Sequence, residues 1–312
     1  MKILITGIAG FIGGNLSEKL LQVQDLNLKI VGIDNLSYGV KENIPEKVEF
    51  HHLDIRSKEI YPLFKGVDYL FHLAAKNCIS DCQADPVETT DVNVAGTVNV
   101  FEAARRAKVK KVIYAESSAI YEGSQAFPTP ESEENPENFY AISKFCGNLF
   151  AQGYKKYFSL KMVGLRYFNV YGPRQDYRRT IPPVMSAFII KLLKGELPII
   201  YGDGSKRRDF VHIEDVNAFH IQCMNDPRTD GKVFNVGSGK NYSVLEIYEM
   251  ISEILGVKIL PIFKPNLPGE ARNTLADITK AKKLGWYPSI DIKTGLKDMI
   301  AYIRGEMARG RI

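Results

Sequence analysis

The sequence has few cysteines, little excess charge and no long apolar run. Its four cysteines, Cys78, Cys82, Cys146 and Cys223, are scattered, and Cys78 and Cys82 lack nearby partners that would complete a metal set. We interpret all four as reduced thiols, which is typical of a cytoplasmic protein. The net charge of +5 is too small to indicate nucleic-acid binding, although it is compatible with an anionic small ligand.

Membrane and export signals are also missing. No apolar run approaches the length of a membrane span, and Met1 leads directly into a predicted strand, so no signal peptide is visible. We therefore expect neither membrane contact nor export. The 312 residues suffice for one large domain or two closely packed domains.

Strands alternate with helices through the first half of the chain. We predict strands at 3–6, 29–34, 48–55, 67–75, 111–117 and 161–169, and long helices from residue 11 and at 91–108 and 140–157. Such alternation predicts an α/β fold, a Rossmann-type doubly wound parallel sheet with helices on both faces. Ligands of these folds lie beyond the carboxyl ends of the strands.

After Tyr171 the pattern loosens, and prolines and glycines cluster. We expect residues 1–170 to form a dinucleotide-binding Rossmann domain. Residues 171–312 should form mainly a smaller mixed α/β substrate domain, with some segments returning to the Rossmann sheet. The acidic, proline-bearing loop 122–138 is expected to be solvated rather than a contact segment.

A glycine-bearing turn follows the first strand. Gly7, Gly10 and Gly13 recur every three residues between an apolar strand and a helix. This pattern suits a dinucleotide pyrophosphate, because the glycines allow close backbone approach and the helix N-terminus offers free N–H groups. Asp34 ends the next strand, where a carboxylate holds the adenosine ribose and repels a 2′-phosphate, so NAD is favoured over NADP.

A tyrosine and a lysine lie one helical turn apart in Tyr140–Ala–Ile–Ser–Lys144. A phenol is a poor base at neutral pH, but a nearby ammonium and the positive nicotinamide ring favour the phenolate. Ser117, at the end of the preceding strand, could share the proton of a substrate hydroxyl. The alternative is an ordinary amphipathic helix surface, and the upstream glycine turn and Asp34 favour the catalytic interpretation.

Ten motifs in a fixed order carry a resemblance to a known family. They are TGIAGFIGG at 6–14, DNLSYG at 34–39, LDIR at 53–56, HLAA at 72–75, NVAGT at 93–97, SSAIY at 117–121, YAISK at 140–144, LRYFNVYGP at 165–173, RRDFVHIEDV at 207–216 and NVGSG at 235–239. Nearly the whole chain resembles the extended short-chain dehydrogenase/reductases. It is most similar to their NAD-dependent nucleotide-sugar epimerases, of the UDP-glucose and UDP-N-acetylglucosamine 4-epimerase type.

The resemblance implies a role for each matching residue. It assigns Ser117, Tyr140 and Lys144 to catalysis. It assigns to the cofactor Gly7, Gly10, Phe11, Ile12, Gly13, Asp34, Asn35, Asp54, Ile55, Leu73, Ala74, Ala75, Asn93, Ser117, Tyr140, Lys144 and Tyr167. It assigns to the nucleotide sugar Ser118, Asn169, Tyr201 on the base, Arg208 and Arg272 on the diphosphate, Glu270 on the ribose, and Thr274.

Four residues bear on the loop, the reaction and the sugar. Glu122 stands where many relatives have the glycine that follows the tyrosine of SSAIY, so we expect a local loop difference. Sugar dehydratases of the family carry an Asp–Glu pair where this chain has Ser118 and Ala119, which argues against dehydration. Thr274 matches a position beside the hexose C2 substituent, where a small residue predicts room for an acetamido group.

The resemblance implies C4 epimerisation of a UDP-hexose through a transient 4-keto sugar, with NAD retained between turnovers and no metal. It also implies a homodimer formed by the helices 91–108 and 140–157. Another oxidoreductase or decarboxylase acting on a nucleotide sugar remains an alternative. So does a non-catalytic dinucleotide sensor, which would have no need for the base Tyr140.

Overall fold

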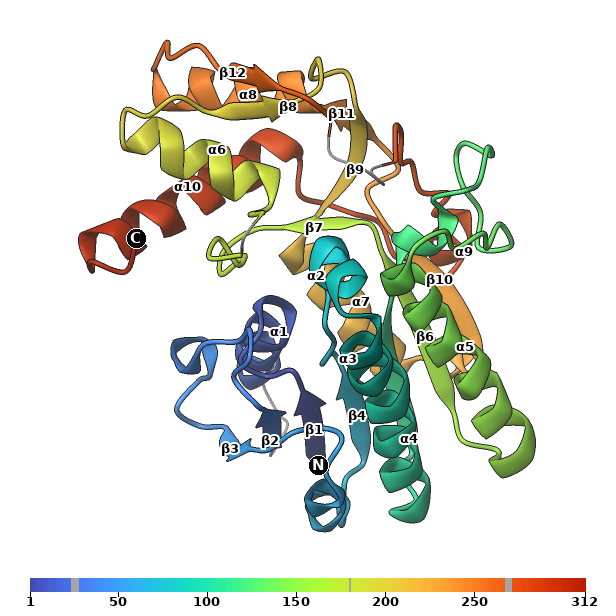
Figure 1. Ribbon diagram of the computed structural model, residues 1–312. Helices are drawn as coiled ribbons and strands as arrows, with labels where there is room; N and C mark the ends of the chain where they lie inside the picture. Colours follow the sequence, from blue (N-terminus) through green and yellow to red (C-terminus); the bar gives the residue numbers. More distant parts are fainter. Residues whose placement is uncertain (24–27, 180, 267–270) are drawn as a thin grey trace.

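The computed structural model describes residues 1–23, 28–179, 181–266 and 271–312 and is built around one large parallel sheet (Figure 1). The strand order in this seven-stranded sheet is β10-β6-β5-β4-β1-β2-β3. The strands are β1 (Lys2–Thr6), β2 (Lys29–Asp34), β3 (Glu49–His52), β4 (Tyr69–His72), β5 (Lys111–Ser117), β6 (Met162–Tyr167) and β10 (Lys232–Val236). From β1 the chain adds β2 and β3 on one side, and then it crosses over to add β4 on the other side of β1. The switch point between β1 and β4 is where such sheets bind ligands.

Alternating side chains of β1 build two cores, one on each face of the sheet. Ile3 and Ile5 pack in the core with helices α1 (Phe11–Leu21) and α7 (Ile213–Asn225). Leu4 packs on the opposite face in the core with α4 (Thr97–Arg106) and α5 (Phe139–Phe158). Both faces are therefore covered, which explains why the strands are continuous apolar runs and confirms the predicted doubly wound fold.

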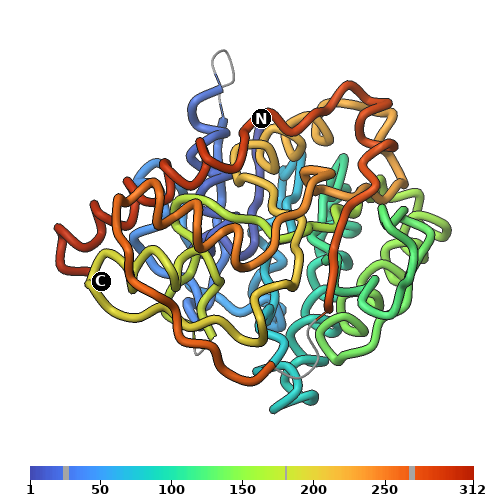
Figure 2. Tube along the Cα trace, turned by 90° about the horizontal axis from the view of Figure 1, so that it is seen from above, coloured from blue at the N-terminus to red at the C-terminus, as the bar shows by residue number. Residues whose placement is uncertain are grey.

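A smaller second part lies beyond the carboxyl ends of the strands (Figure 1). It contains the mixed sheet β11-β9-β7 and the pair β12-β8. Its strands are β7 (Asn169–Tyr171), β8 (Ile199–Tyr201), β9 (Arg207–His212), β11 (Asn241–Ser243) and β12 (Ile262–Lys264), and its helices are α6 (Val184–Leu193), α8 (Val244–Leu255) and α10 (Ile292–Ala308). The short helix α9 (Thr279–Lys282) instead packs against β10 of the large sheet. Figure 2 looks down on the smaller part, with its yellow and orange segments crossing over blue and cyan ones.

Two segments after residue 171 belong to the large sheet. β10 pairs in parallel with β6, and α7 packs against α1 and β5. The chain therefore passes repeatedly between its two parts. The division into domains near residue 170 stays a prediction.

Several short elements complete the described chain. They are α2 (Ile79–Ala84), α3 (Pro86–Thr90), the π-helix η3 (Asp91–Gly96), and the 3₁₀ helices η1 (Lys41–Asn43), η2 (Lys58–Phe64), η4 (Ser118–Tyr121) and η5 (Pro227–Thr229). The predicted helix 91–108 is thus a π-helical segment followed by α4. The predicted strand 161–169 is also divided, because β6 ends at Tyr167 and Asn169 begins β7 in the other sheet.

The acidic loop 122–138 is anchored, so the expectation that it is merely solvated is wrong. The buried guanidinium of Arg166 donates to Glu134 Oε1 at 2.8 Å, and the backbone N–H of Asn235 donates to Glu131 Oε1 at 2.9 Å. Composition suggested solvation, but a buried cation draws carboxylates and carbonyl oxygens towards itself. The loop therefore packs against β6 and β10 beside the sheet edge where ligands are expected.

Candidate active site

The glycine turn between β1 and α1 leaves no space for side chains. Gly7 has φ of 74°, and a Cβ on it would lie 2.7 Å from the backbone nitrogen of Ala74. A Cβ on Gly13 would lie 2.2 Å from the carbonyl oxygen of Gly7. Gly10 is the N-cap of α1, and the first turn carries no acidic residue, so its N–H groups and positive dipole end suit a pyrophosphate.

Asp34 lies at the end of β2 and holds the glycine turn. Its Oδ2 accepts the Ala9 N–H at 3.0 Å, and its Oδ1 accepts the Leu36 N–H at 2.8 Å. Burial raises the pKa of this carboxyl, while the two backbone hydrogen bonds lower it. The predicted ribose ligand therefore also has a structural task, which the sequence did not indicate.

The other predicted adenosine residues lie near Asp34. Asn35 Nδ2 donates to Asp54 Oδ2 at 2.9 Å. The Arg56 guanidinium donates hydrogen bonds to both carboxylate oxygens of Asp54, and this contact lowers the pKa of Asp54 to about 2. Ile55 is buried in the second core and packs against Gly96.

The segment after β4 approaches the glycine turn from the other side of the switch point. Ala74 lies against Gly7, and the Leu73 N–H donates to the Thr6 carbonyl at 3.1 Å. Asn93, predicted to line the cofactor, is 2% exposed and binds the Lys76 backbone N–H at 2.8 Å and carbonyl at 2.9 Å. Its amide also donates to Ser143 Oγ at 3.0 Å, so it joins this segment to helix α5.

The three predicted catalytic residues lie at the carboxyl end of β5 and in the first turns of α5. Ser117 ends β5 and accepts the Ala119 N–H at 3.2 Å, and its interaction with Tyr140 lowers the pKa of the phenol. Asn138 caps α5 by accepting the Ala141 N–H at 2.9 Å, which fixes where Tyr140 enters the helix. Lys144 follows one turn later and is 7% exposed.

Burial dominates the electrostatics of this group. It raises the pKa of Tyr140, which the hydrogen bond with Ser117 and the positive charge of Arg179 lower. It lowers the pKa of Lys144 to about 8, whereas the negative charge of Glu116 raises it. Arg179 is a nearby cation that sequence reasoning missed, because the order of residues gives no sign that the segment before α6 reaches Tyr140.

Two predicted substrate residues lie together beside β9. The amide of Asn169 donates to the Asp209 carbonyl at 3.0 Å and reaches Thr274 Oγ1 at 3.4 Å. Thr274 Oγ1 also accepts the Asp209 N–H at 3.1 Å. Tyr167 is directed elsewhere, since its hydroxyl is hydrogen-bonded to Nε2 of the buried His220 at 2.6 Å.

The remaining predicted substrate residues come from separate elements. Arg208 lies in β9, and its positive charge lowers the pKa of Glu122. Tyr201 ends β8, and the Arg272 carbonyl accepts the Arg207 N–H at 3.1 Å. Ser118 begins η4 next to Ser117. Glu270 lies outside the described residues.

Asp209 organises the loops around Thr274, and sequence reasoning missed it. This carboxylate is 0% exposed and accepts the backbone N–H groups of Ser238, Gly239 and Ala276 at 2.6 to 3.0 Å. A carboxylate inside a strand was the available signal, because a buried charge requires several hydrogen-bond donors.

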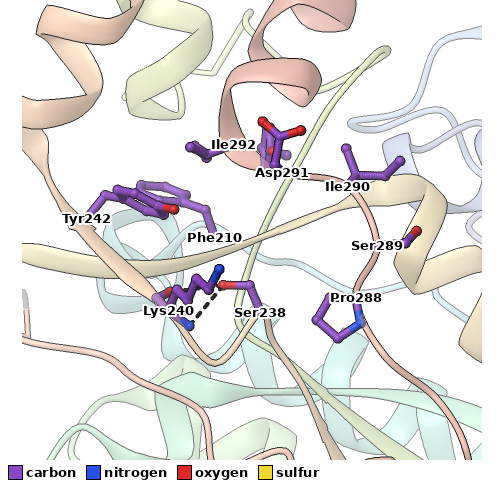
Figure 3. Close-up of a pocket in the computed structure, with 10 residues that line it drawn as sticks. Phe210, Ser238, Lys240, Tyr242, Pro288, Ser289, Ile290, Asp291 and Ile292 are labelled. Atoms are coloured by element: carbon purple, nitrogen blue, oxygen red, sulfur yellow. Dashed lines mark hydrogen bonds between the residues drawn. The ribbon is translucent and has the colours of Figure 1, made fainter.

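A cavity of about 150 Å³ lies on the other side of this region, between β9, β11 and the start of α10 (Figure 3). Figure 3 shows Tyr242 and Phe210 facing Pro288 and Ser289 across it. None of the described residues that the sequence assigns to the site lines this cavity.

Among the described residues, no cluster of three or more histidine, cysteine, aspartate or glutamate residues could hold a metal ion. None of the helices in the described ranges has the length and apolar character needed to cross a membrane.

A dinucleotide turn at the switch point of a parallel sheet, next to a Ser–Tyr–Lys group, defines a class of nucleotide-dependent enzymes. The sequence model of the NAD dependent epimerase/dehydratase family matches residues 3–237, and the chain belongs to this family. Its cofactor is NAD, and the glycine turn and the uncapped N-terminus of α1 fit that group.

Solved structures resemble the chain over nearly its full length. A UDP-glucose 4-epimerase of Thermotoga maritima with UDP-glucose is 33% identical, with a TM-score of 0.94, and the match covers 98% of this chain and 100% of that one. A UDP-N-acetylglucosamine 4-epimerase of Methanobrevibacter ruminantium, in complex with UDP-N-acetylmuramic acid, is 31% identical, with a TM-score of 0.93 and coverage of 98% and 99%. A UDP-glucuronic acid 4-epimerase of Bacillus cereus, in complex with UDP-glucuronic acid and NAD, is 30% identical, with a TM-score of 0.91 and the same coverage.

Proposed function

We propose that this protein catalyses the NAD-dependent C4 epimerisation of a UDP-hexose, including UDP-N-acetylhexosamines, through a transient 4-keto sugar. The observation that carries the proposal is that Ser117, Tyr140 and Lys144 come together at the sheet edge that holds the glycine turn, with Lys144 one helical turn from Tyr140. A non-catalytic sensor would not need this buried proton-transfer group.

The chemistry follows from these three side chains. Tyr140, as a phenolate, removes the proton of the C4 hydroxyl, with Ser117 as the relay. The ammonium of Lys144 favours the phenolate and would hold the nicotinamide ribose by hydrogen bonds. When bound, NAD supplies reversible hydride transfer at C4.

The rest of the substrate is held away from the reacting carbon. Arg208 and Arg272 bind the diphosphate, Tyr201 stacks on the base, and Asn169 and Ser118 contact the sugar diphosphate and hexose. Glu270 would hold the nucleotide ribose. A tightly held diphosphate lets the 4-keto hexose turn over between two hydride transfers without leaving the enzyme, and it supplies binding energy remote from C4.

Thr274 supports the inclusion of N-acetylated sugars. Its hydroxyl is hydrogen-bonded to the β9 backbone and lies next to Asn169, so a short side chain occupies this position. Thr274→Tyr should abolish turnover of UDP-N-acetylglucosamine and retain that of UDP-glucose, whereas Thr274→Ser should retain both. Equal loss of both substrates in Thr274→Tyr would contradict this assignment.

The experiment is to incubate the purified protein, without added NAD, with UDP-glucose or with UDP-N-acetylglucosamine and to follow the C4 epimers by NMR. Interconversion of both supports the proposal. Consumption of added NAD or release of carbon dioxide would instead indicate an oxidoreductase or decarboxylase. Absence of any conversion, with NAD confirmed in the protein, would overturn the epimerase assignment.

We also propose a homodimer formed through η3, α4 and α5. The outer face of α5 carries Ile142, Leu149 and Phe150 with exposed fractions of 43%, 51% and 45%. A groove lined by Val94 and Val98 runs beside Phe150. Two copies related by a two-fold axis would bury these apolar side chains in a four-helix interface.

A further inference from the structure

Glu122 lies at the start of the acidic loop and contacts the residue that caps the catalytic helix. It follows directly after η4, and its partly buried carboxyl is influenced by Arg208 of β9, by Glu137 of its own loop and by Tyr140 of α5. Under the proposed function, Tyr140 marks the reacting C4 and Arg208 the diphosphate. The hexose would therefore lie in the part of the site where the Glu122 carboxyl interacts with both groups.

The position of the carboxyl is fixed by the catalytic helix. Asn138, which caps α5, donates from Nδ2 to Glu122 Oε2, and its Oδ1 accepts the Ala141 N–H at 2.9 Å. One side chain thus holds both Glu122 and the start of the helix that carries Tyr140. Since Oε2 is occupied, Oε1 can accept a hydrogen bond from a bound sugar.

The charges around Glu122 distinguish between sugars. Arg208 attracts the carboxylate, but a bound diphosphate would compete for this guanidinium. Arg179, the cation that influences Tyr140, has Asp176 at 3.7 Å from its Nε and donates to Asn77 Oδ1 at 3.4 Å. With the diphosphate bound, the carboxylate of Glu122 therefore faces the hexose with less positive charge to balance it.

We propose that Glu122 is a specificity residue: its carboxylate accepts a hydrogen bond from a hydroxyl or acetamido N–H of an uncharged hexose and excludes hexoses that carry a carboxylate. This inference rests on the proposed function and narrows its substrate class. UDP-glucuronate differs from UDP-glucose only in its C6 carboxylate, and a like charge at short range weakens binding. UDP-glucose and UDP-N-acetylglucosamine are accepted, and UDP-glucuronate is rejected.

The test compares kcat/KM for UDP-glucose and UDP-glucuronate at pH 8.5 in the wild type, Glu122→Gln and Glu122→Asp. The wild type should favour UDP-glucose, and Glu122→Gln should shift the ratio towards UDP-glucuronate by about tenfold, which corresponds to about 1.4 kcal/mol. Glu122→Asp keeps the charge and should keep the preference. Glu133→Gln makes the same change at an exposed position of the loop and serves as the matched control.

The outcomes separate the two proposals. If the wild type epimerises UDP-glucose and UDP-glucuronate equally well, or if Glu122→Gln leaves the ratio unchanged, the role of Glu122 is refuted while the epimerase assignment stands. If the NAD-loaded wild type epimerises no UDP-sugar, both fail. Calorimetric binding of UDP-glucuronate to Glu122→Gln provides a second readout: binding that stays as weak as in the wild type also contradicts the proposal.

Discussion

The phenolic oxygen of Tyr140 is the proposed base of the reaction. Burial raises its pKa, while the interaction with Ser117 and the positive charge of Arg179 lower it. A phenol in such a setting needs further positive charge to become a base, and the nicotinamide ring of NAD⁺ carries one. Catalysis at this residue and cofactor binding are therefore linked.

Replacing Tyr140 by phenylalanine tests this assignment. Tyr140→Phe should fold, retain NAD and lose activity by roughly 10²–10⁴-fold, because the ring still packs while the proton acceptor is gone. Bound NAD can be measured by absorbance after denaturation, and activity by NMR of the C4 epimers. Tyr157→Phe, on the exposed end of the same helix, is the control and should be fully active. Undiminished activity of Tyr140→Phe would refute the mechanism.

Glu122 makes stability depend on pH in a defined direction. Burial raises the pKa of its carboxyl from 4.5 to about 7, so the folded state holds a proton that the unfolded state releases above pH 4.5. Its contribution to the free energy of unfolding is therefore fully present below pH 4.5 and is lost as the pH rises through about 7.

Urea denaturation at pH 5 and pH 8 measures this effect. Between these pH values, Glu122→Gln should lose less stability than the wild type, because the glutamine has no proton to release. Glu133→Gln should follow the wild type. Parallel pH dependence of Glu122→Gln and the wild type would show that the Glu122 carboxyl is not perturbed.

Among the elements, the β1–turn–α1 unit has the least tolerance for change. The strand, the glycines and the helix could each be predicted from the order of residues, since apolar continuity and glycine spacing are local signals. The contact between Gly7 and Ala74 could not, because it depends on the register of β4 beside β1. The same reason explains why the three-residue strands β7 and β11 were missed: their partners lie far away in the chain.

Gly13→Ala tests this unit. Its Cβ would lie 2.2 Å from the Gly7 carbonyl oxygen, so the turn and the helix must move apart. We expect NAD affinity to fall at least tenfold, about 1.4 kcal/mol or more, with a smaller effect on folding. Gly153→Ala, in α5 with nothing within 4 Å of its Cβ, should leave NAD binding unchanged. Isothermal titration with NAD measures both, and unaltered affinity of Gly13→Ala would contradict the assigned role of the turn.

Across the whole molecule, local patterns were enough to predict the parallel sheet but not the way in which the two parts interlock. Regular alternation of strands and helices indicated the sheet, and prolines and glycines after Tyr171 indicated the change in architecture. Arg166 anchors loop 122–138, and Asp209 accepts three backbone N–H groups. Both arrangements depend on residues that are far apart in the chain. Composition therefore misjudged the loop, and sequence reasoning missed Asp209.

The proposed dimer is tested by its apolar surface. Leu149→Glu places a charge in the centre of the expected four-helix interface and should convert a dimer into a monomer, as measured by size-exclusion chromatography with light scattering. Leu260→Glu is the control, because Leu260 is 79% exposed on the distant β12 side and should not alter the mass. A wild-type mass equal to one chain would rule out the dimer.

The return of β10 to the large sheet limits how this protein can be divided. A fragment ending at residue 170 would lack β10 and α7, leaving β6 as an unpaired edge and the apolar face that α7 covers open to water. Such a fragment should aggregate rather than bind NAD as an independent module. Exchange of substrate-binding segments between related enzymes by joining chains at residue 170 should therefore fail, whereas grafts that keep β10 and α7 with the sheet should fold.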